Sequence, residues 1–228
     1  EEKATGLLGE RWSKHKKTVE KYWQEIHKYF SKKKLSARGR SASGWKGVKI
    51  FQDGLPIGGE RGKSLVNKLA KTGSPNYKLL KNLIDQGATL LKTEEPTLLK
   101  KEYQLIKDLV TKKNLLLAIF SFLNYKFKKD SLLKARDEYI ANQINQNLGK
   151  GETGICFLGA YHEVLPKLAE DIKVVFVKNP DNVKKYYQLL SGGEKIGKVN
   201  GLARYLTRPI KEGKIQNTKS NEEYEQRR

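Results

Sequence analysis

Short apolar runs alternate with longer amphipathic stretches along the chain. Five of these runs are only four or five residues long and are rich in β-forming residues, which indicates strands. They are residues 4–8, 48–51, 88–91, 154–158 and 173–177. Strands that alternate with helices are typical of a parallel sheet, because a parallel crossover usually takes a helix. The pattern therefore predicts an α/β fold, with a mostly parallel central sheet of about five strands and helices on both faces.

Helical periodicity fills the intervals between the apolar runs. Val19, Tyr22, Trp23, Ile26 and Phe30 recur at three-to-four spacing and predict one such helix. Similar spacing from Leu98 to Val110 and from Asp130 to Leu148 predicts a helical insertion over residues 96–149.

The domain organisation follows from these patterns. We expect a single α/β domain over residues 1–190 and a weakly patterned C-terminal extension over 191–228. Residues 32–47 are basic, rich in serine and glycine and poor in apolar residues, which predicts a mobile basic loop.

Composition limits the class of protein. Hydrophobic residues make up 37% of the chain, enough for a core, but the longest apolar run, residues 115–123, is far shorter than the ~20 residues of a membrane span. We therefore predict no membrane span. A lone cysteine, Cys156, excludes an internal disulfide and favours a reducing, cytoplasmic environment.

The chain is strongly basic, with 46 Lys and Arg residues against 25 Asp and Glu and a net charge of +21. Positive charge next to aromatic rings is typical of proteins that bind nucleic acid or another polyanion. Tyr29 and Trp45 are the candidate stacking residues. The candidate cations lie in the N-terminal region: Lys14, Lys16, Lys17, Lys32, Lys33, Lys34, Arg38 and Arg40. The alternative is a solvated basic face that serves solubility.

Acidic and imidazole side chains follow three of the expected strands. Asp53 follows the second, Glu94 and Glu95 the third, and His162 the fourth. Ligands of open α/β sheets bind at the carboxyl ends of the strands, so we expect these groups to share one edge. Such a cluster is a candidate for metal binding, with His162 and Asp53 as ligands, or for acid–base chemistry.

Each of these residues also has a structural interpretation. Glu94 and Glu95 precede Pro96, where acids favour the start of a helix. Asp53 precedes Gly54 in a turn-like segment, and His162 is also consistent with a solvated loop histidine.

Arg136 lies within the apolar stripe of the helix expected from Asp130 to Leu148. It comes three residues after Leu133 and four before Ile140. A guanidinium held against a core needs an anionic or polar partner, because unpaired burial is costly. The alternative is a boundary arginine that lies on the core and extends its charged group to water.

Two segments, in this order, resemble the TraB/Tiki family, which is related in fold to erythromycin-esterase-like and ChaN-like proteins. Ala135-Arg-Asp-Glu-Tyr-Ile-Ala141 is similar to the arginine helix of that family, and Gly159-Ala-Tyr-His162 to its second G-x-x-H motif. The resemblance covers about residues 130–178 in its motifs. At the first G-x-x-H, Gly9-Glu-Arg-Trp12 has tryptophan in place of histidine, and Asp53 stands where the family usually has glutamate.

The resemblance implies metal-dependent hydrolysis of an amide or ester, with a divalent metal as cofactor. His162, Asp53, Glu94 and Glu95 are then the candidate metal ligands or acid–base groups, and Arg136 orients a carboxylate or stabilises negative charge. The alternative function is that of a basic protein that binds nucleic acid or another polyanion without catalysis.

Overall fold

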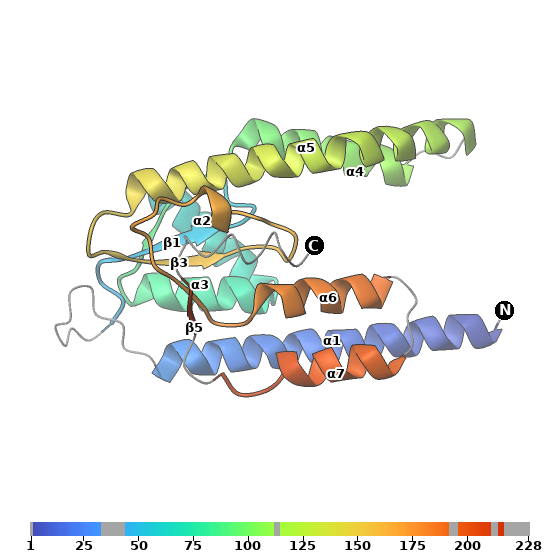
Figure 1. The fold of residues 1–228 in the computed structure, drawn as a ribbon, viewed down its shortest axis with the longest axis horizontal. Coiled ribbons are helices and arrows are strands. Elements are labelled where there is room, and N and C mark those ends of the chain that lie inside the picture. The colour runs from blue at the N-terminus through green and yellow to red at the C-terminus, as the bar shows by residue number, and fades with distance from the viewer. Residues whose placement is uncertain (1, 33–43, 112–114, 192–195, 211–213, 217–228) are drawn as a thin grey trace.

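The computed structural model describes residues 2–32, 44–111, 115–191, 196–210 and 214–216. Two helical arms extend in the same direction from a small sheet (Figure 1). One arm is the hairpin of α4 (Pro96–Thr111) and α5 (Leu115–Asn147). The other contains α1 (Glu2–Lys32), α6 (Pro180–Ser191) and α7 (Ile196–Leu206).

The central sheet has three parallel strands. β1 (Val48–Gln52) lies between β2 (Thr89–Leu90) and β3 (Thr153–Phe157). Ile50 is in register with Leu90 on one side and with Ile155 on the other. The prediction of an α/β fold with a central sheet of about five strands is therefore wrong: across the described residues, helices dominate and the parallel sheet has three strands.

Two of the five expected strands do not belong to this sheet. Residues 4–8 lie in α1, because Leu8 continues the three-to-four spacing that leads through Trp12 and His15 to Val19. The run at 173–177 does form a strand, β4 (Val174–Phe176), but it pairs antiparallel with β5 (Lys214–Gln216) in a separate two-stranded sheet.

The side chains of β1 alternate between two hydrophobic clusters. Val48 and Ile50 belong to the larger one, which includes Ile26 and Phe30 of α1 and residues of α2 (Gly59–Lys71) and α3 (Pro75–Asp85). Phe51 belongs to the smaller one, in which it packs with Ile140, Ala141 and Ile144 of α5 and with Val164, just before the short 3-10 helix Leu165–Lys167. This packing fixes the second half of α5 against the sheet.

Residues 32–47, expected to form a mobile basic loop, contain a buried core residue near their end. Trp45 is buried, packs its ring against Phe30 and donates its backbone N–H to Gln86 O at 2.8 Å. It is a core residue, and the prediction that it is available for stacking is wrong. Residues 33–43, which include Lys33, Lys34, Arg38 and Arg40, lie outside the described part of the chain.

The C-terminal extension contains more regular structure than its weak pattern suggested, since α7 and β5 both lie in it. The helical insertion over 96–149 agrees closely with α4 and α5. Among the helices in the described ranges, none combines the length and the apolar character that a membrane crossing requires.

Candidate functional site

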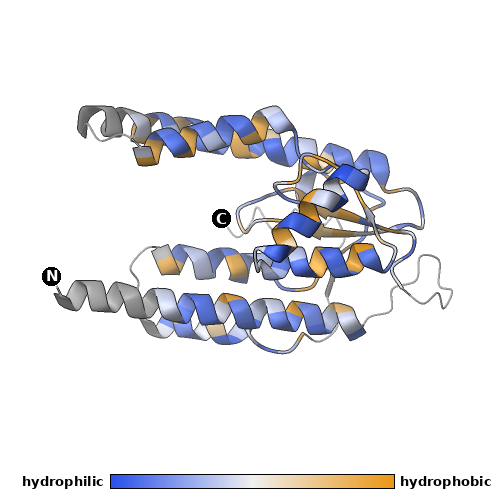
Figure 2. Cartoon of the chain, turned by 180° about the vertical axis from the view of Figure 1, so that it is seen from behind, coloured by the Kyte–Doolittle hydropathy of each residue, from blue (hydrophilic) through white to orange (hydrophobic). Residues whose placement is uncertain are grey.

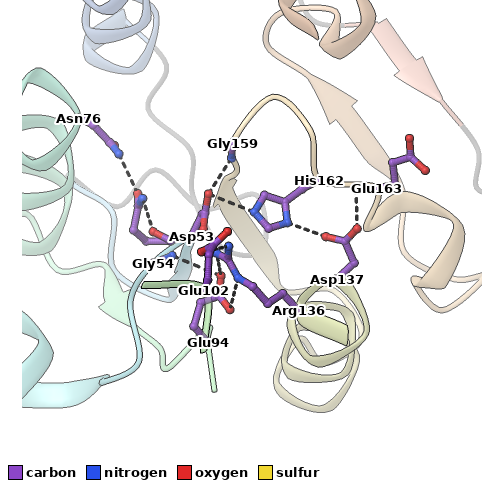
Figure 3. Close-up of polar contacts among 11 residues, drawn as sticks. Asp53, Gly54, Asn76, Glu94, Glu102, Arg136, Asp137, Gly159, His162 and Glu163 are labelled. Carbon is purple, nitrogen blue, oxygen red and sulfur yellow. Dashed lines mark hydrogen bonds and ion pairs between the residues drawn. The ribbon is translucent and has the colours of Figure 1, made fainter. Parts of the chain in front are cut away.

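The carboxyl ends of the three parallel strands bring acidic and imidazole groups together (Figure 3). Asp53 directly follows β1, Glu94 lies four residues after the end of β2, and His162 lies five residues after the end of β3. Because the strands run parallel, their carboxyl ends meet at one edge of the sheet. The structure thus brings together residues from three loops that are far apart in the sequence.

Backbone hydrogen bonds hold the first two loops in place. Asp53 N–H extends the pairing of β1 with β3 by donating to Phe157 O at 2.9 Å. The backbone N–H groups of Thr93 and Glu94 both donate to Leu55 O at 3.1 Å. The hydroxyl of Thr93 accepts a hydrogen bond from the backbone N–H of Gln52 at 3.0 Å. These bonds fix the Asp53 and Glu94 backbones relative to each other.

Arg136 reaches this edge from α5 and is buried among carboxylates. Its Nη2 donates to Asp53 Oδ1 at 2.6 Å and to Glu94 Oε1 at 2.5 Å, and its Nε donates to Glu94 Oε2 at 3.3 Å. Its Nη1 donates to Glu102 Oε2 of α4 at 2.6 Å. Three carboxylates therefore surround the guanidinium, as its position in the apolar stripe required.

His162 is held between two carboxylates. Its Nδ1 lies 2.5 Å from Asp137 Oδ1, and its Nε2 lies 3.2 Å from Asp53 Oδ2. The second oxygen of Asp137 accepts the backbone N–H of Glu163 at 2.9 Å, which fixes the carboxylate itself. Burial alone would lower the pKa of His162, but the hydrogen bonds and charges of Asp137 and Asp53 outweigh burial and raise this pKa to about 9.

The pKa values of the Asp53 and Glu94 carboxyls are shifted in opposite directions. Burial would raise the pKa of Asp53, but the hydrogen bond and charge of His162, together with Arg136, hold the pKa of this carboxyl well below its usual range. Glu94 is completely buried, and burial raises its pKa; the neighbouring Asp53 adds to this effect and Arg136 opposes it. Burial lowers the pKa of the Arg136 guanidinium, but Glu94, Asp53 and Glu102 more than reverse this and raise it.

Gly159 explains why the motif Gly159-Ala-Tyr-His162 begins with glycine. Its backbone N–H donates to Asp53 Oδ2 at 3.0 Å. A Cβ atom at this position would lie 2.9 Å from the same oxygen and 3.4 Å from Cδ2 of His162. The loop therefore approaches the carboxylate so closely that a side chain would displace it.

Four of the five candidate catalytic residues meet at this edge: Asp53, Glu94, Arg136 and His162. The fifth, Glu95, is placed elsewhere, because its carboxylate pairs with Lys92 at 3.2 Å.

The position of the first G-x-x-H also lies away from the edge of the sheet. Trp12 is in α1, is 67% exposed and packs its ring against His15. His15 in turn hydrogen-bonds the hydroxyl of Tyr186 at 3.0 Å.

Two residues of the cluster were missed by the sequence analysis. Asp137 follows Arg136 in the same segment, so a search for a carboxylate partner of His162 near the arginine would have found it. Glu102 lies in α4 among exposed residues, and no signal distinguishes it from Asp108, the other acid of that helix.

Three of these side chains have the geometry of a metal-binding group. One ligand atom from each of Asp53, Glu94 and His162 lies within 4.8 Å of the other two. One imidazole nitrogen and two carboxylate oxygens are a donor set that divalent transition metals accept. The Asp53 side chain is 22% exposed, whereas those of His162 and Glu94 are almost fully buried.

Comparison with known proteins gives no family for this chain: no family model, curated protein or solved structure matches it.

Proposed function

We propose that this protein is a hydrolase that uses a divalent metal at the edge of its parallel sheet, with Asp53, Glu94 and His162 as ligands. The observation that carries the proposal is the set of three donor atoms within 4.8 Å of one another, delivered by three separate strand ends. The arginine helix is followed along the chain by Gly159-Ala-Tyr-His162. This order resembles the TraB/Tiki family, and the resemblance supports an amide or ester as the substrate class.

The hydrogen bonds of His162 support its role as a ligand. Metal-binding histidines almost always donate their second ring N–H to a carboxylate, a carbonyl or water, which fixes the tautomer and the ring orientation. Here Asp137 accepts from Nδ1 at 2.5 Å, and Nε2 faces Asp53. Asp137 is therefore a positioning residue.

The charge balance of the cluster also favours a cation. Four carboxyl groups, those of Asp53, Glu94, Glu102 and Asp137, surround only two basic groups, Arg136 and His162, in a chain of net charge +21. A metal can replace the proton of His162, since a ligating imidazole is neutral. Binding is therefore expected to release a proton.

A bound metal would supply a Lewis acid and a water of lowered pKa. The chain's own residues do the rest. Arg136 holds Asp53 and Glu94 in place, and because its Nε, Nη1 and Nη2 all donate to carboxylates, it positions ligands and does not bind substrate. Asp53 is the most accessible of the three ligands, and its low pKa suits it to hold a metal as a carboxylate rather than to act as a general base.

The test is to titrate the metal-free protein with Mn²⁺ and with Zn²⁺ by calorimetry in buffers of different ionisation enthalpy. We expect binding with proton release, abolished in His162→Ala and weakened about 10- to 100-fold in Asp137→Asn. Glu95→Gln is the matched control, because this acid pairs with Lys92 outside the cluster. Hydrolysis of a panel of peptides and aryl esters should depend on the same metal. Absence of binding to the wild-type protein would refute the proposal.

A second candidate function, binding of single-stranded nucleic acid, is favoured by exposed residues in the first half of α1. Trp12 is 67% exposed and is followed by the exposed Lys14, Lys16 and Lys17. Bases stack on exposed aromatic rings, and lysines contact the phosphates. Trp12→Ala should weaken oligonucleotide binding about 5-fold or more, by the loss of one stacking contact. Charge reversal at Lys16 and Lys17 should reduce the dependence of binding on salt. Binding that does not change with salt would exclude this function.

A further inference from the structure

Between Ser121 and Lys129, α5 presents three large apolar side chains to solvent. Phe122 is 53% exposed and Phe127 78%, and Leu123 is exposed as well. On the same stretch, Ser121 and Asn124 are half-buried. A helix that packs in a soluble protein shows the opposite arrangement, with apolar residues inward and polar residues outward. Apart from the half-buried Tyr125, the large apolar side chains of this stretch are thus more exposed than its small polar ones.

The exposed residues form one face of the helix. Phe122, Leu123, Lys126 and Phe127 follow one another at spacings that place them on the same side of α5. The neighbouring helix of the hairpin, α4, adds an exposed stripe of its own from Tyr103, Ile106 and Val110, and it has no fully buried residue. Figure 2 shows hydrophobic segments on both helices in the outer part of this arm. Such a surface needs an apolar partner.

The charges of this face point to an anionic partner. Lys126 lies within the apolar face, Lys129 borders it next to Phe122, and both are exposed. From residue 121 to residue 129 the chain has no acid, and the first acid after it, Asp130, lies 3.8 Å from Lys129. A second copy docked on this face would bring lysines against lysines. A membrane surface of anionic lipid matches both features, because apolar side chains enter the acyl boundary while lysines extend to the phosphates.

We propose that the exposed face of the α4–α5 hairpin, centred on Phe122, Leu123, Lys126 and Phe127, docks onto anionic lipid bilayers. The helix lies at the interface and does not cross it. Phe127 and Arg136 are nine residues apart on α5, a rise of about 14 Å along the helix axis. Docking of the outer hairpin therefore places the sheet-edge site near the membrane surface, with its own residues uninvolved in lipid contact.

The test is co-sedimentation of the full chain with vesicles of phosphatidylcholine and with vesicles that also contain phosphatidylglycerol. We expect binding to the second kind alone. Phe122→Ser with Phe127→Ser should weaken it at least about tenfold, since each ring loses its apolar burial. Lys126→Glu with Lys129→Glu should weaken it about tenfold or more. Circular dichroism melting checks that these surface variants remain folded.

The matched control is Lys16→Glu with Lys17→Glu, which changes the net charge equally but on α1. Its binding should fall less than that of the hairpin variant. Equal losses in the two lysine variants would mean that overall charge governs binding, which overturns the proposal. The proposal is also overturned if the wild-type protein does not bind anionic vesicles, or if both hairpin variants bind them as well as the wild type does. A dimer that dissociates when Phe122 and Phe127 are replaced, without vesicle binding, would identify a second copy as the partner and also overturn it.

Discussion

The two ends of α5 use their side chains in opposite ways. At the inner end Arg136, Asp137 and Ile140 are buried, and the guanidinium donates to three carboxylates. At the outer end Phe122 and Phe127 are exposed. One helix thus combines an inner segment whose charges find their partners within the chain with a stretch of exposed aromatic rings further out. The fold accounts for the first, and the proposed docking to an anionic bilayer would account for the second.

Replacing Arg136 with methionine should produce the largest loss of stability. The change leaves Glu94 fully buried and Asp53 largely so, without the guanidinium. Breaking a buried ion pair by removing one partner typically costs about 3–5 kcal/mol. Urea unfolding measures the loss, and Lys134→Met, at an exposed position of the same helix, is the control. A loss below about 1 kcal/mol would show that the inner end of α5 does not depend on this network.

His162 should make the stability of the metal-free protein depend on pH. Its pKa is about 9 in the folded protein, against an ordinary value of 6.5 for a solvated histidine. A raised pKa means that the stabilisation is complete below pH 6.5 and is lost as the pH rises through about 9. Over this window the free energy of unfolding should fall by up to about 3 kcal/mol.

Urea unfolding at several pH values across this window measures the effect, and Asp137→Asn provides the comparison. Without that carboxylate the pKa of His162 should move back toward its usual value, so the loss should be smaller and should end at lower pH. Identical pH profiles for the two proteins would contradict the assignment. Metal affinity should show the opposite trend and rise with pH, because a ligating imidazole is neutral.

Much of the site could be predicted from the sequence because its residues follow clear signals. Asp53, Glu94 and His162 each come shortly after a short apolar run, and Arg136 interrupts an apolar stripe. These local patterns do not depend on the wrongly predicted size of the sheet, since the three strands that carry the site are present in the structure. Their convergence depends only on parallel pairing and not on the size of the sheet.

The rest could not be predicted because it depends on tertiary contacts. Residues 4–8 are compatible with a strand or with the start of a helix. In the structure they belong to the helix, because the helical spacing of α1 continues through them. Trp45 ends a segment of low apolar content, and only its packing against Phe30 shows that it is buried. Glu102 belongs to the site because the α4–α5 hairpin brings it to Arg136.

Gly159→Ala should have an intermediate effect. The added Cβ would lie 2.9 Å from Asp53 Oδ2, so the carboxylate or the loop has to move. We expect a loss of about 1–3 kcal/mol in unfolding free energy, and weaker metal binding because Asp53 is displaced. Gly201→Ala is the control: it meets open space within α7, and alanine favours a helix, so stability should stay unchanged or rise. Equal behaviour of the two variants would show that the loop adapts without strain.

The smallest effect is expected at the outer end of α5. Phe127 is 78% exposed, so serine at this position removes little buried apolar surface. The free energy of unfolding should stay within about 0.5 kcal/mol of the wild-type value, as for most surface substitutions. A loss above about 1 kcal/mol would mean that the ring packs within the monomer. The contrast between the two ends of α5 would then disappear, because the apolar side chains of the outer end would have an internal role after all.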